Sequence, residues 1–261
     1  MQTRTTVIKI GGALLKAPEI LSAFWPALQA LSAQERVIIV HGGGPQSTAM
    51  ARRLGHEPTI VNGRRVTTDI DLSILQWTIC GELNAYLVAE GFKYGLPTVG
   101  LRGIDGGTLR VNRRPPWTID GRQVDFGWVG DVDHINPRLL QTLLAAGLMP
   151  IMAPLGIDKA GQTYNVNADT VAHAVAVALQ ADALLLVTES GGVRRMASDS
   201  STRIQSMDKE LFAAGKTDGW IKDGMLVKLK MAFEAREAGI SDVFILPPDD
   251  IFSRTSGTAV V

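Results

Sequence analysis

Two short apolar runs, each followed at once by glycine residues, constrain the fold of this chain most strongly. The first is Val7-Ile8-Lys9-Ile10 before Gly11-Gly12, and the second is Val37-Ile38-Ile39-Val40 before His41-Gly42-Gly43-Gly44. Each run has the composition of a buried strand, and apolar residues at helical spacing lie between them. This order predicts two parallel strands whose glycine turns meet at one sheet edge, where open α/β folds bind ligands.

Lys9 stands out because it lies inside an apolar strand. Burying an ammonium group is costly unless an anion meets it. The glycines after the strand bring bare backbone N–H groups close to a ligand, and Pro45 suits the first turn of a helix that begins at the same edge. A lysine on an edge strand before an ordinary turn would leave the same local pattern. The pair of glycine turns, rather than either one, therefore predicts a phosphate-binding site.

The rest of the chain continues to alternate helices and strands, which predicts an α/β fold. We expect helices over residues 18–31 (kinked or split at Pro26), 45–54, 69–90, 137–146, 169–179 and from 222 onward. Strands are expected over residues 97–101, 148–153, 183–187 and 243–246. Turn signals predict β-hairpins between residues 105 and 129, at Asp105-Gly106-Gly107 and Asp120-Gly121, and another around residues 158–161.

The composition of the 261-residue chain excludes several classes of protein. A hydrophobic content of 46% supports a sizeable core in one large or two small domains. A formal net charge of +0 without a long basic run argues against a nucleic-acid partner. The single Cys80 is expected to be an inert buried thiol in a reducing compartment. Without a signal-peptide pattern or a long apolar run, we expect a cytoplasmic protein with no membrane partner.

Arginines occur in two of the predicted loop regions. Arg64 and Arg65 follow Asn62-Gly63, where they are either solvated or hold a carboxylate through the guanidinium fork. Arg110, Arg113 and Arg114 lie among the predicted hairpins, and we expect all three to be solvated.

Polar residues also precede a strongly apolar helix in Asn165-Val166-Asn167-Ala168-Asp169. Alternation places Asn165 and Asn167 on one face of an extended segment, which suits a polar contact with a substrate. Asp169 suits the N-cap of the helix, and the stretch alone is typical of a turn followed by a cap. Lys228 lies off the apolar stripe of the helix that begins near residue 222, where it either faces a cleft or is simply exposed.

Five motifs in this order resemble the amino acid kinase family over nearly the whole chain. They are Lys-Ile-Gly-Gly from Lys9, His-Gly-Gly-Gly from His41, Asn-Gly-x-Arg-Val-Thr from Asn62, Asn-Val-Asn-Ala-Asp from Asn165 and Asp-Gly-Met-x-x-Lys from Asp223. The branch that phosphorylates acylated glutamate is the most similar. The resemblance implies a three-layer αβα sandwich around an open, mostly parallel sheet. Residues 1–168 would hold the acyl amino acid, and residues 169–261 the nucleotide.

The resemblance also implies a reaction. ATP would transfer its γ-phosphoryl group to the γ-carboxylate of an N-acylglutamate, most simply N-acetylglutamate, giving an acyl phosphate in arginine biosynthesis. Because this carboxylate is already ionised at pH 7, catalysis needs positioning and charge neutralisation rather than a general base. We see no residue dedicated to a metal ion, so Mg²⁺ is expected on the nucleotide phosphates.

Particular residues acquire roles by the same resemblance. Lys9 would contact the transferred phosphoryl group, Lys228 the leaving ADP, and Asp169 would fix the positions of both lysines. The resemblance also implies that backbone N–H groups bind the transferred phosphoryl group and the attacking carboxylate, namely those of Gly11, Gly12, Gly43 and Gly44. Arg65 would hold the α-carboxylate of the substrate. Asn165 and Asn167 would contact the rest of the substrate.

Some features depart from the family pattern or leave alternatives open. Glu189 stands where aspartate is common, and residues 194–206 are unusual, so the details of the ATP site stay open. The acyl group is also open between acetyl and succinyl. Carrier-bound aminoadipate and other amino acids are alternative substrates. Only eight residues precede Lys9, too few for the extra N-terminal helix of arginine-inhibited relatives, so we expect a homodimer that is insensitive to arginine.

Two other classes of protein fit the sequence less well. A nicotinamide-dependent oxidoreductase would need G-x-G-x-x-G after the first strand, and Gly11-Gly12-Ala13 does not satisfy that pattern. A regulatory protein without catalysis would be expected to lack Lys9, Asp169 or Lys228, and all three are present.

Overall fold

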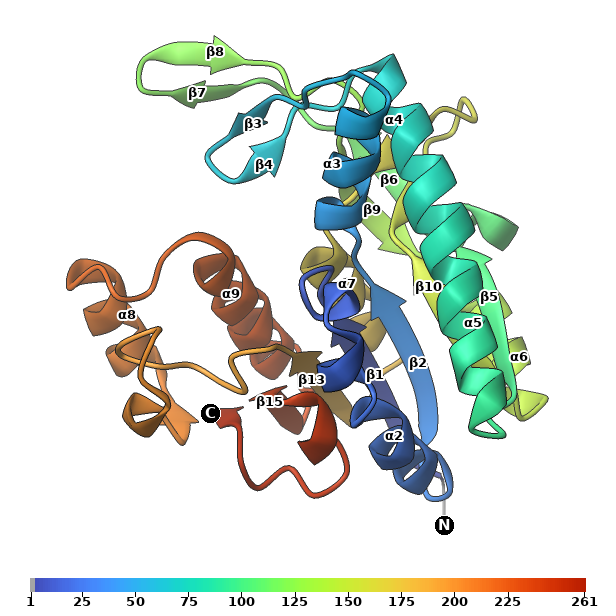
Figure 1. Cartoon of the computed structure of the whole chain (residues 1–261), viewed down its shortest axis with the longest axis vertical. Helices are drawn as coiled ribbons and strands as arrows, with labels where there is room; N and C mark the ends of the chain where they lie inside the picture. The colour runs from blue at the N-terminus through green and yellow to red at the C-terminus, as the bar shows by residue number, and fades with distance from the viewer. Residues whose placement is uncertain (1–2) are drawn as a thin grey trace.

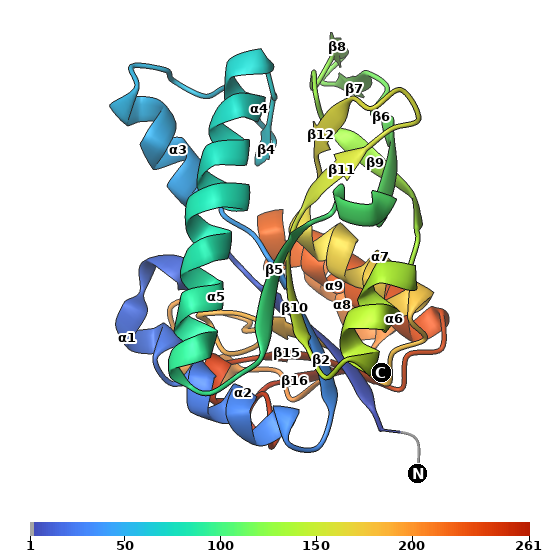
Figure 2. The ribbon, with the colours of Figure 1, turned by 90° about the vertical axis from the view of Figure 1, so that its right-hand side faces the viewer.

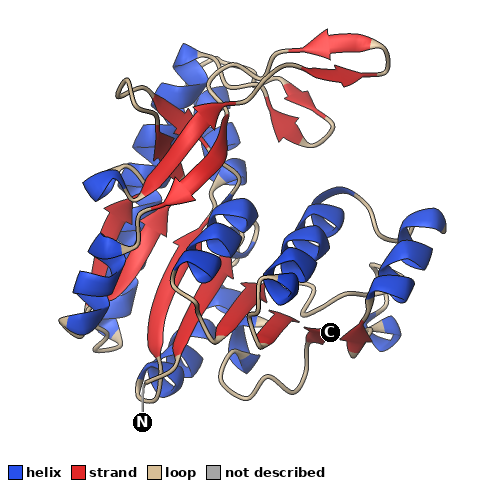
Figure 3. Ribbon diagram, turned by 180° about the vertical axis from the view of Figure 1, so that it is seen from behind, coloured by secondary structure: helices blue, strands red, loops and turns tan. Residues whose placement is uncertain are grey.

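A single large sheet with helices on both faces forms the centre of the molecule (Figure 1 and Figure 3). The computed structural model describes residues 3–261, and within them eight strands form this sheet. Their order across the sheet is β14 (Ser206–Met207), β16 (Thr258–Val260), β15 (Asp242–Leu246), β13 (Ala183–Val187), β1 (Thr5–Ile10), β2 (Arg36–His41), β10 (Met149–Ala153) and β5 (Thr98–Arg102). All neighbours are parallel except β15 and β16, which run antiparallel. The expected three-layer α/β sandwich is confirmed.

The two faces of the sheet carry separate hydrophobic cores. One core is shared with α1 (Pro18–Leu21), α2 (Phe24–Ser32), α4 (Asp69–Leu75) and α5 (Asn84–Lys93), and the other with α6 (Arg138–Ala145), α7 (Ala168–Ala178), α8 (Lys209–Thr217) and α9 (Asp223–Glu237). Side chains alternate between the faces of a strand. Ile8 and Ile10 belong to the first core and Val7 to the second. Lys9 therefore points toward the face that α7 and α9 cover.

The predicted helix over residues 69–90 is confirmed and continues to Lys93 (Figure 2). It begins with a capping box in which the Thr68 side chain and the Asp71 carboxylate each accept a hydrogen bond from the other residue's backbone N–H. Between α4 and α5 lies a π-helical segment, Gln76–Leu83. Such segments are rare and are often found at functional sites. This one packs against α3 (Gly44–Arg53), which begins directly after the second glycine turn.

A smaller sheet and two hairpins lie at one end of the main sheet (Figure 1). The smaller sheet has the order β12 (Thr163–Asn165), β11 (Leu155–Ile157), β6 (Leu109–Arg113) and β9 (Gly130–Ile135), and the hairpins are β3 (Ile60–Val61) with β4 (Arg64–Arg65) and β7 (Trp117–Ile119) with β8 (Arg122–Val124). The turn at Asp120-Gly121 has positive φ at both residues, 48° and 75°, which confirms the hairpin predicted there.

Two local expectations were wrong. The break in the first predicted helix falls between Leu21 and Phe24, not at Pro26. Pro26 is the third residue of α2, where its missing N–H would have had no partner within the helix. Residues Asp105–Gly107 form a 3₁₀ turn rather than a hairpin.

Two further expectations concern the division into domains and the membrane. The proposed division between residues 168 and 169 stays a prediction; it falls at the first turn of α7, and the main sheet draws strands from both sides of it. No helix in the described part of the chain combines the length and the apolar character needed to cross a membrane.

Candidate active site

The two glycine turns meet at one edge of the sheet, as the sequence predicts. Strands β1 and β2 pair in parallel with Ile10 opposite His41, and the Gly42 N–H donates to the Ile10 carbonyl at 2.8 Å. A Cβ atom at Gly12 would lie 3.1 Å from the Cα of Gly43, and one at Gly43 would lie 2.6 Å from a side-chain carbon of Leu83. Close approach of the two turns to each other and to the π-helical segment therefore excludes side chains at these positions.

These turns leave backbone donors available for a ligand. Among residues 3–261, the N–H groups of Gly11, Gly12 and Gly43 have no hydrogen-bond acceptor. Gly44 is the first residue of α3, so its N–H also lacks a partner within the helix. Unpaired N–H groups at a helix N-terminus and in a glycine turn form a ready site for an anion.

The buried imidazole of His41 connects the second glycine turn to α5 through two hydrogen bonds. His41 Nδ1 lies 3.0 Å from the Gly42 carbonyl oxygen, and Nε2 lies 3.1 Å from the Asn84 amide nitrogen. Burial lowers the pKa of His41 to about 4, so the ring is neutral. The neutral ring donates from Nδ1 to Gly42 and accepts at Nε2 from Asn84. Nothing in the spacing of the sequence predicted this partnership of β2 with α5.

Three charged residues from three different elements meet below the turns. Lys9 of β1, Asp169 of α7 and Lys228 of α9 are 6%, 8% and 8% exposed. The Asp169 Oδ1 atom lies 3.0 Å from Lys9 Nζ and 2.8 Å from Lys228 Nζ, and Lys9 also donates to Oδ2 at 3.1 Å. The carboxylate therefore bridges the two ammonium groups, the arrangement implied by the resemblance.

The charges of this cluster shift the pKa values of its members. Burial alone would raise the pKa of Asp169, but the charges of Lys9 and Lys228 outweigh burial and lower it to about 2. Burial lowers the pKa of Lys9 to about 8, with a further contribution from the charge of Lys228, while Asp169 opposes the shift. At neutral pH the cluster thus contains two ammonium groups and one carboxylate, with a net positive charge for an anionic ligand to neutralise.

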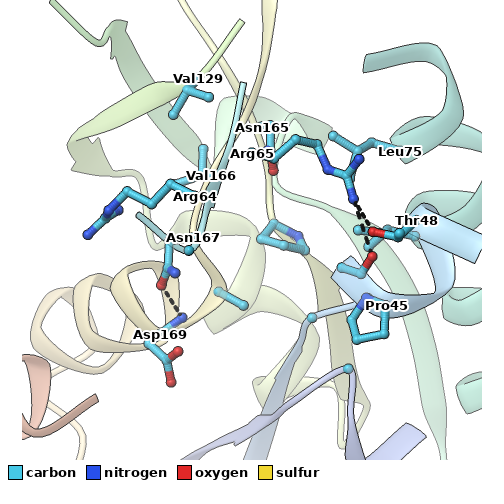
Figure 4. Close-up of a pocket in the computed structure, with 18 of the residues that line it drawn as sticks. Pro45, Thr48, Arg64, Arg65, Leu75, Val129, Asn165, Val166, Asn167 and Asp169 are labelled. Atoms are coloured by element: carbon cyan, nitrogen blue, oxygen red, sulfur yellow. Dashed lines mark hydrogen bonds between the residues drawn. The ribbon is translucent and has the colours of Figure 1, made fainter. Parts of the chain in front are cut away.

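The cluster borders a cavity of about 410 Å³ beside the glycine turns (Figure 4). Of the site residues predicted from the sequence, those that line it are Lys9, Gly12, Gly43, Gly44, Arg65, Asn165, Asn167 and Asp169. Gly11 and Lys228 are not part of the lining. Lys228 is connected to the cavity through Asp169, and Gly11 adjoins Lys9, since a Cβ atom there would lie 3.7 Å from Lys9 Nζ.

Arg65 is fixed on the side of the cavity formed by α3. Its guanidinium donates to Thr48 Oγ1 at 2.6 Å and to Asp71 Oδ1 at 3.3 Å. Figure 4 shows it directed at Thr48, with Pro45 below. These partners leave further N–H donors of the guanidinium for a ligand.

The two asparagines also line the cavity, and one of them corrects a prediction. Asn167, not Asp169, is the N-cap of α7: its side-chain oxygen accepts from the backbone N–H groups of Asp169 at 2.9 Å and Thr170 at 3.1 Å. Asp169 is the second residue of the helix, so its carboxylate is free to meet the lysines. Asn165 donates to Thr67 Oγ1 at 3.1 Å.

Comparison with known proteins assigns the chain to a family. The model of the amino acid kinase family matches residues 4–247. The chain belongs to the amino acid kinase family. The acetylglutamate kinase of Anaeromyxobacter dehalogenans is 41% identical over 246 residues, which cover 93% of this chain and 91% of that protein. The acetylglutamate kinase of Methanopyrus kandleri is 40% identical over 239 residues, covering 92% and 93%.

Comparison with solved structures agrees with the sequence comparison. A crystal structure from Streptococcus mutans superposes with a TM-score of 0.81 at 27% identity and covers 98% of both chains. These similarities confirm the expected enzyme class, a phosphotransferase with a carboxyl group as acceptor. Membership of this kinase family implies ATP as the co-substrate.

Two arginines that were not among the predicted site residues also line the cavity of this amino acid kinase. Arg114 was expected to be solvated, but it is buried and donates to Asp131 Oδ1 from Nε at 2.9 Å and Nη2 at 2.6 Å. Arg64 lies in the short strand β4 rather than in a loop, and its side chain also lines the cavity. Arg113, in contrast, is half-exposed, pairs with Asp125 and is not part of the lining. The guanidinium of Arg114 lies over the ring of Trp117, and these two residues are only three positions apart in the sequence. Nothing in the sequence indicated that Asp131 is the carboxylate partner of Arg114.

Proposed function

We propose that this chain transfers the γ-phosphoryl group of ATP to the γ-carboxylate of an N-acylglutamate, as a step of arginine biosynthesis. The observation that carries the proposal is the carboxylate of Asp169 bridging two buried lysines beside turns with unpaired N–H groups. The relatives named acetylglutamate kinase support an acylated glutamate as the acceptor, with N-acetylglutamate the first to test.

The topology supports a position for each substrate. The acyl amino acid would occupy the cavity beside β1 and β2, with its γ-carboxylate at the N–H groups of Gly43 and Gly44 and its α-carboxylate at Arg65. Strand β13 adjoins β1 on the other side, with Val187 opposite Ile10, so the glycine-containing turn after β13 lies at the same edge. ATP would lie over that side of the edge, with its γ-phosphate next to Lys9. The cluster would then stand between the two substrates.

The chemistry needs no proton transfer from the enzyme. A γ-carboxylate oxygen forms a bond to the γ-phosphorus, and the bond from that phosphorus to the bridging oxygen of ADP breaks. Negative charge moves toward ADP while two anions are held together. Lys9 and the N–H groups of Gly11 and Gly12 would stabilise the phosphoryl group in transit, and Lys228 the charge that develops on ADP. Fixed donors in a site of low dielectric are the largest catalytic contribution available to such a reaction.

Magnesium fits this scheme as part of the nucleotide substrate. No group of three or more His, Cys, Asp or Glu side chains in the described residues could hold a metal ion. Asp169 is already engaged by two lysines. We therefore propose that Mg²⁺ is coordinated mainly by the ATP phosphates, where it neutralises further charge.

Hydroxylamine trapping tests the proposal directly, because hydroxylamine displaces phosphate from an acyl phosphate to give a hydroxamate, which forms a coloured complex with ferric iron. We expect hydroxamate and ADP with MgATP and an N-acylglutamate, and neither with free glutamate or aspartate. Lys9→Met should abolish the signal while the protein stays folded. Product from free glutamate or aspartate alone would contradict the proposed acceptor, and absence of product from every acylglutamate would contradict the reaction. The homodimer and its insensitivity to arginine stay predictions.

A further inference from the structure

Two cationic groups that line the cavity, Arg64 and Arg114, take no part in the proposed reaction. Arg64 lines the cavity from β4 and is partly buried. Among residues 3–261, no carboxylate lies within 4 Å of its guanidinium nitrogens, and no acceptor hydrogen bonds to them. Burial lowers the pKa of Arg64, and the charge of nearby Arg114 lowers it further. A guanidinium in such surroundings is stabilised when an anion binds it.

Trp117 of β7 holds this guanidinium at the cavity together with that of Arg114. The Cζ atoms of Arg64 and Arg114 lie 5.0 Å and 4.6 Å from the centre of the Trp117 ring. The only carboxylate bound to either arginine in the described structure is Asp131, which pairs with Arg114. The group of two arginines and Asp131 therefore keeps a net charge of +1. Stacking on the indole restricts the side chains in advance, which reduces the entropy lost on binding a ligand.

The position of Arg64 relative to Arg65 indicates which part of the substrate it would meet. Successive side chains of a strand point in opposite directions, and in Figure 4 Arg65 is directed toward Thr48 whereas Arg64 is directed away from it, on the side of Val166 and Asn167. If Arg65 binds the α-carboxylate and the glycine turns bind the γ-carboxylate, the remaining branch of the α-carbon is the acylamino group. That branch would extend toward Arg64.

We propose that the acyl group itself ends in a carboxylate that Arg64 binds, so that the preferred substrate is glutamate acylated by a short dicarboxylic acid, of which succinate is the simplest probe. The inference rests on the proposed function and specifies its substrate. A guanidinium matches a carboxylate in geometry as well as in charge. The apolar side chains of Val129 and Val166, which also line the cavity, suit the methylene groups between the two ends. An acetyl group would leave Arg64 without an anion, and sites built for a polar group reject analogues that lack it.

The test compares three substrates with the wild-type enzyme. N-succinylglutamate carries the terminal carboxylate, N-butyrylglutamate has an acyl chain of the same number of carbons without it, and N-acetylglutamate is the short neutral form. We expect kcat/KM, measured by ADP release, to be about 10- to 100-fold higher for the succinyl compound than for either neutral one, the range for one charge-assisted hydrogen-bonded contact.

Two variants assign the preference to Arg64. Arg64→Gln should lower kcat/KM for N-succinylglutamate by about the same 10- to 100-fold and leave the two neutral substrates nearly unchanged. Arg113→Gln is the matched control, because it removes a guanidinium from the same region that is half-exposed, paired with Asp125 and outside the cavity. It should change none of the three values. A thermal melt of each variant establishes that it is folded.

The outcomes separate this inference from the proposed function. Equal or higher kcat/KM for N-acetylglutamate in the wild-type enzyme would overturn the inference and keep the function, and this result needs no variant. An equal loss for all three substrates in Arg64→Gln would also overturn it, because Arg64 would then bind the part they share. Failure to phosphorylate any acylglutamate would overturn the function itself, and with it the inference.

Discussion

Replacing Asp169 by asparagine tests how the cluster works, because the change removes one charge and almost no volume. The Nζ atoms of Lys9 and Lys228 lie 3.0 Å and 2.8 Å from the same carboxylate oxygen, so they are at most about 6 Å apart. At an effective dielectric constant of about 20, the attraction between Lys9 and Asp169 is roughly 5 kcal/mol and the repulsion between the two lysines roughly 3 kcal/mol. Without the carboxylate, the already lowered pKa of Lys9 should fall below neutral pH.

The assay is the initial rate of ADP release across pH 6 to 9 at saturating substrates. At pH 8, Lys9 of the variant should be largely neutral. We expect kcat to fall by about 100-fold or more, the loss typical of one electrostatic donor at a reacting centre. At pH 6 part of Lys9 regains its proton, so the ratio of variant to wild-type rates should rise.

A rate near the wild-type value at pH 8, or a deficit that is the same at every pH, would refute this reasoning. Asp208→Asn is a suitable control, since Asp208 caps α8 by accepting from the Leu211 N–H and lies outside the cavity. Breaking a buried ion pair costs about 3–5 kcal/mol of stability, so the melting temperature of Asp169→Asn must be measured alongside the rate.

Three further results are expected. In the wild-type enzyme, kcat/KM should fall above about pH 8 as Lys9 loses its proton, and an alkaline limb that persists in Lys9→Arg would assign it to another group. Gly43→Ala should destabilise the protein by about 1–3 kcal/mol, because its Cβ would clash with the π-helical segment, whereas Gly44→Ala, with nothing within 4 Å of its Cβ, should keep the melting temperature. Arg65→Ala should raise KM for the acylglutamate by about 10-fold or more, and a change in the KM for ATP alone would show that Arg65 does not bind the acyl amino acid.

The sequence predicted the features of the fold that depend on local patterns. The two glycine turns and the helix from Asp69 were found because apolar periodicity and capping signals lie within a few residues of one another. The break before Phe24 was misplaced because proline is a strong local signal whose effect depends on its position within the helix. Strand β16 (Thr258–Val260) was not predicted at all. It is only three residues long, and its place beside β15 depends on tertiary packing.

The residues of the site also fall into those that local sequence patterns predicted and those that depend on tertiary packing. That Lys9 needs an anion followed from the cost of burying its charge, but its partner Asp169 is 160 residues away and was assigned to a helix cap. Only the resemblance to amino acid kinases connected the two. Arg114 was assigned to the solvent because the alternation around it suggested an exposed hairpin. Its burial depends on Asp131, which pairing between β6 and β9 brings beside it, and on Trp117 at the start of β7. Sequence patterns therefore located the chemistry at the sheet edge but not the side chains that complete it.

The energetics of the lysine cluster indicate why it exists. Lowering the pKa of Asp169 from 3.8 to about 2 contributes roughly 2 kcal/mol to stability at pH 7, a contribution lost as pH falls from about 4 toward 2. Lowering the pKa of Lys9 from 10.5 to about 8 costs roughly 3 kcal/mol at pH 7, a cost relieved as pH rises from 8 toward 10.5. The two shifts act in opposite directions, because the attraction between Asp169 and the lysines works against the cost of burying their charges. A buried arrangement that retains excess positive charge is best explained by an anion that binds there. Each phosphate or carboxylate that enters the site would relieve the repulsion that the free enzyme carries.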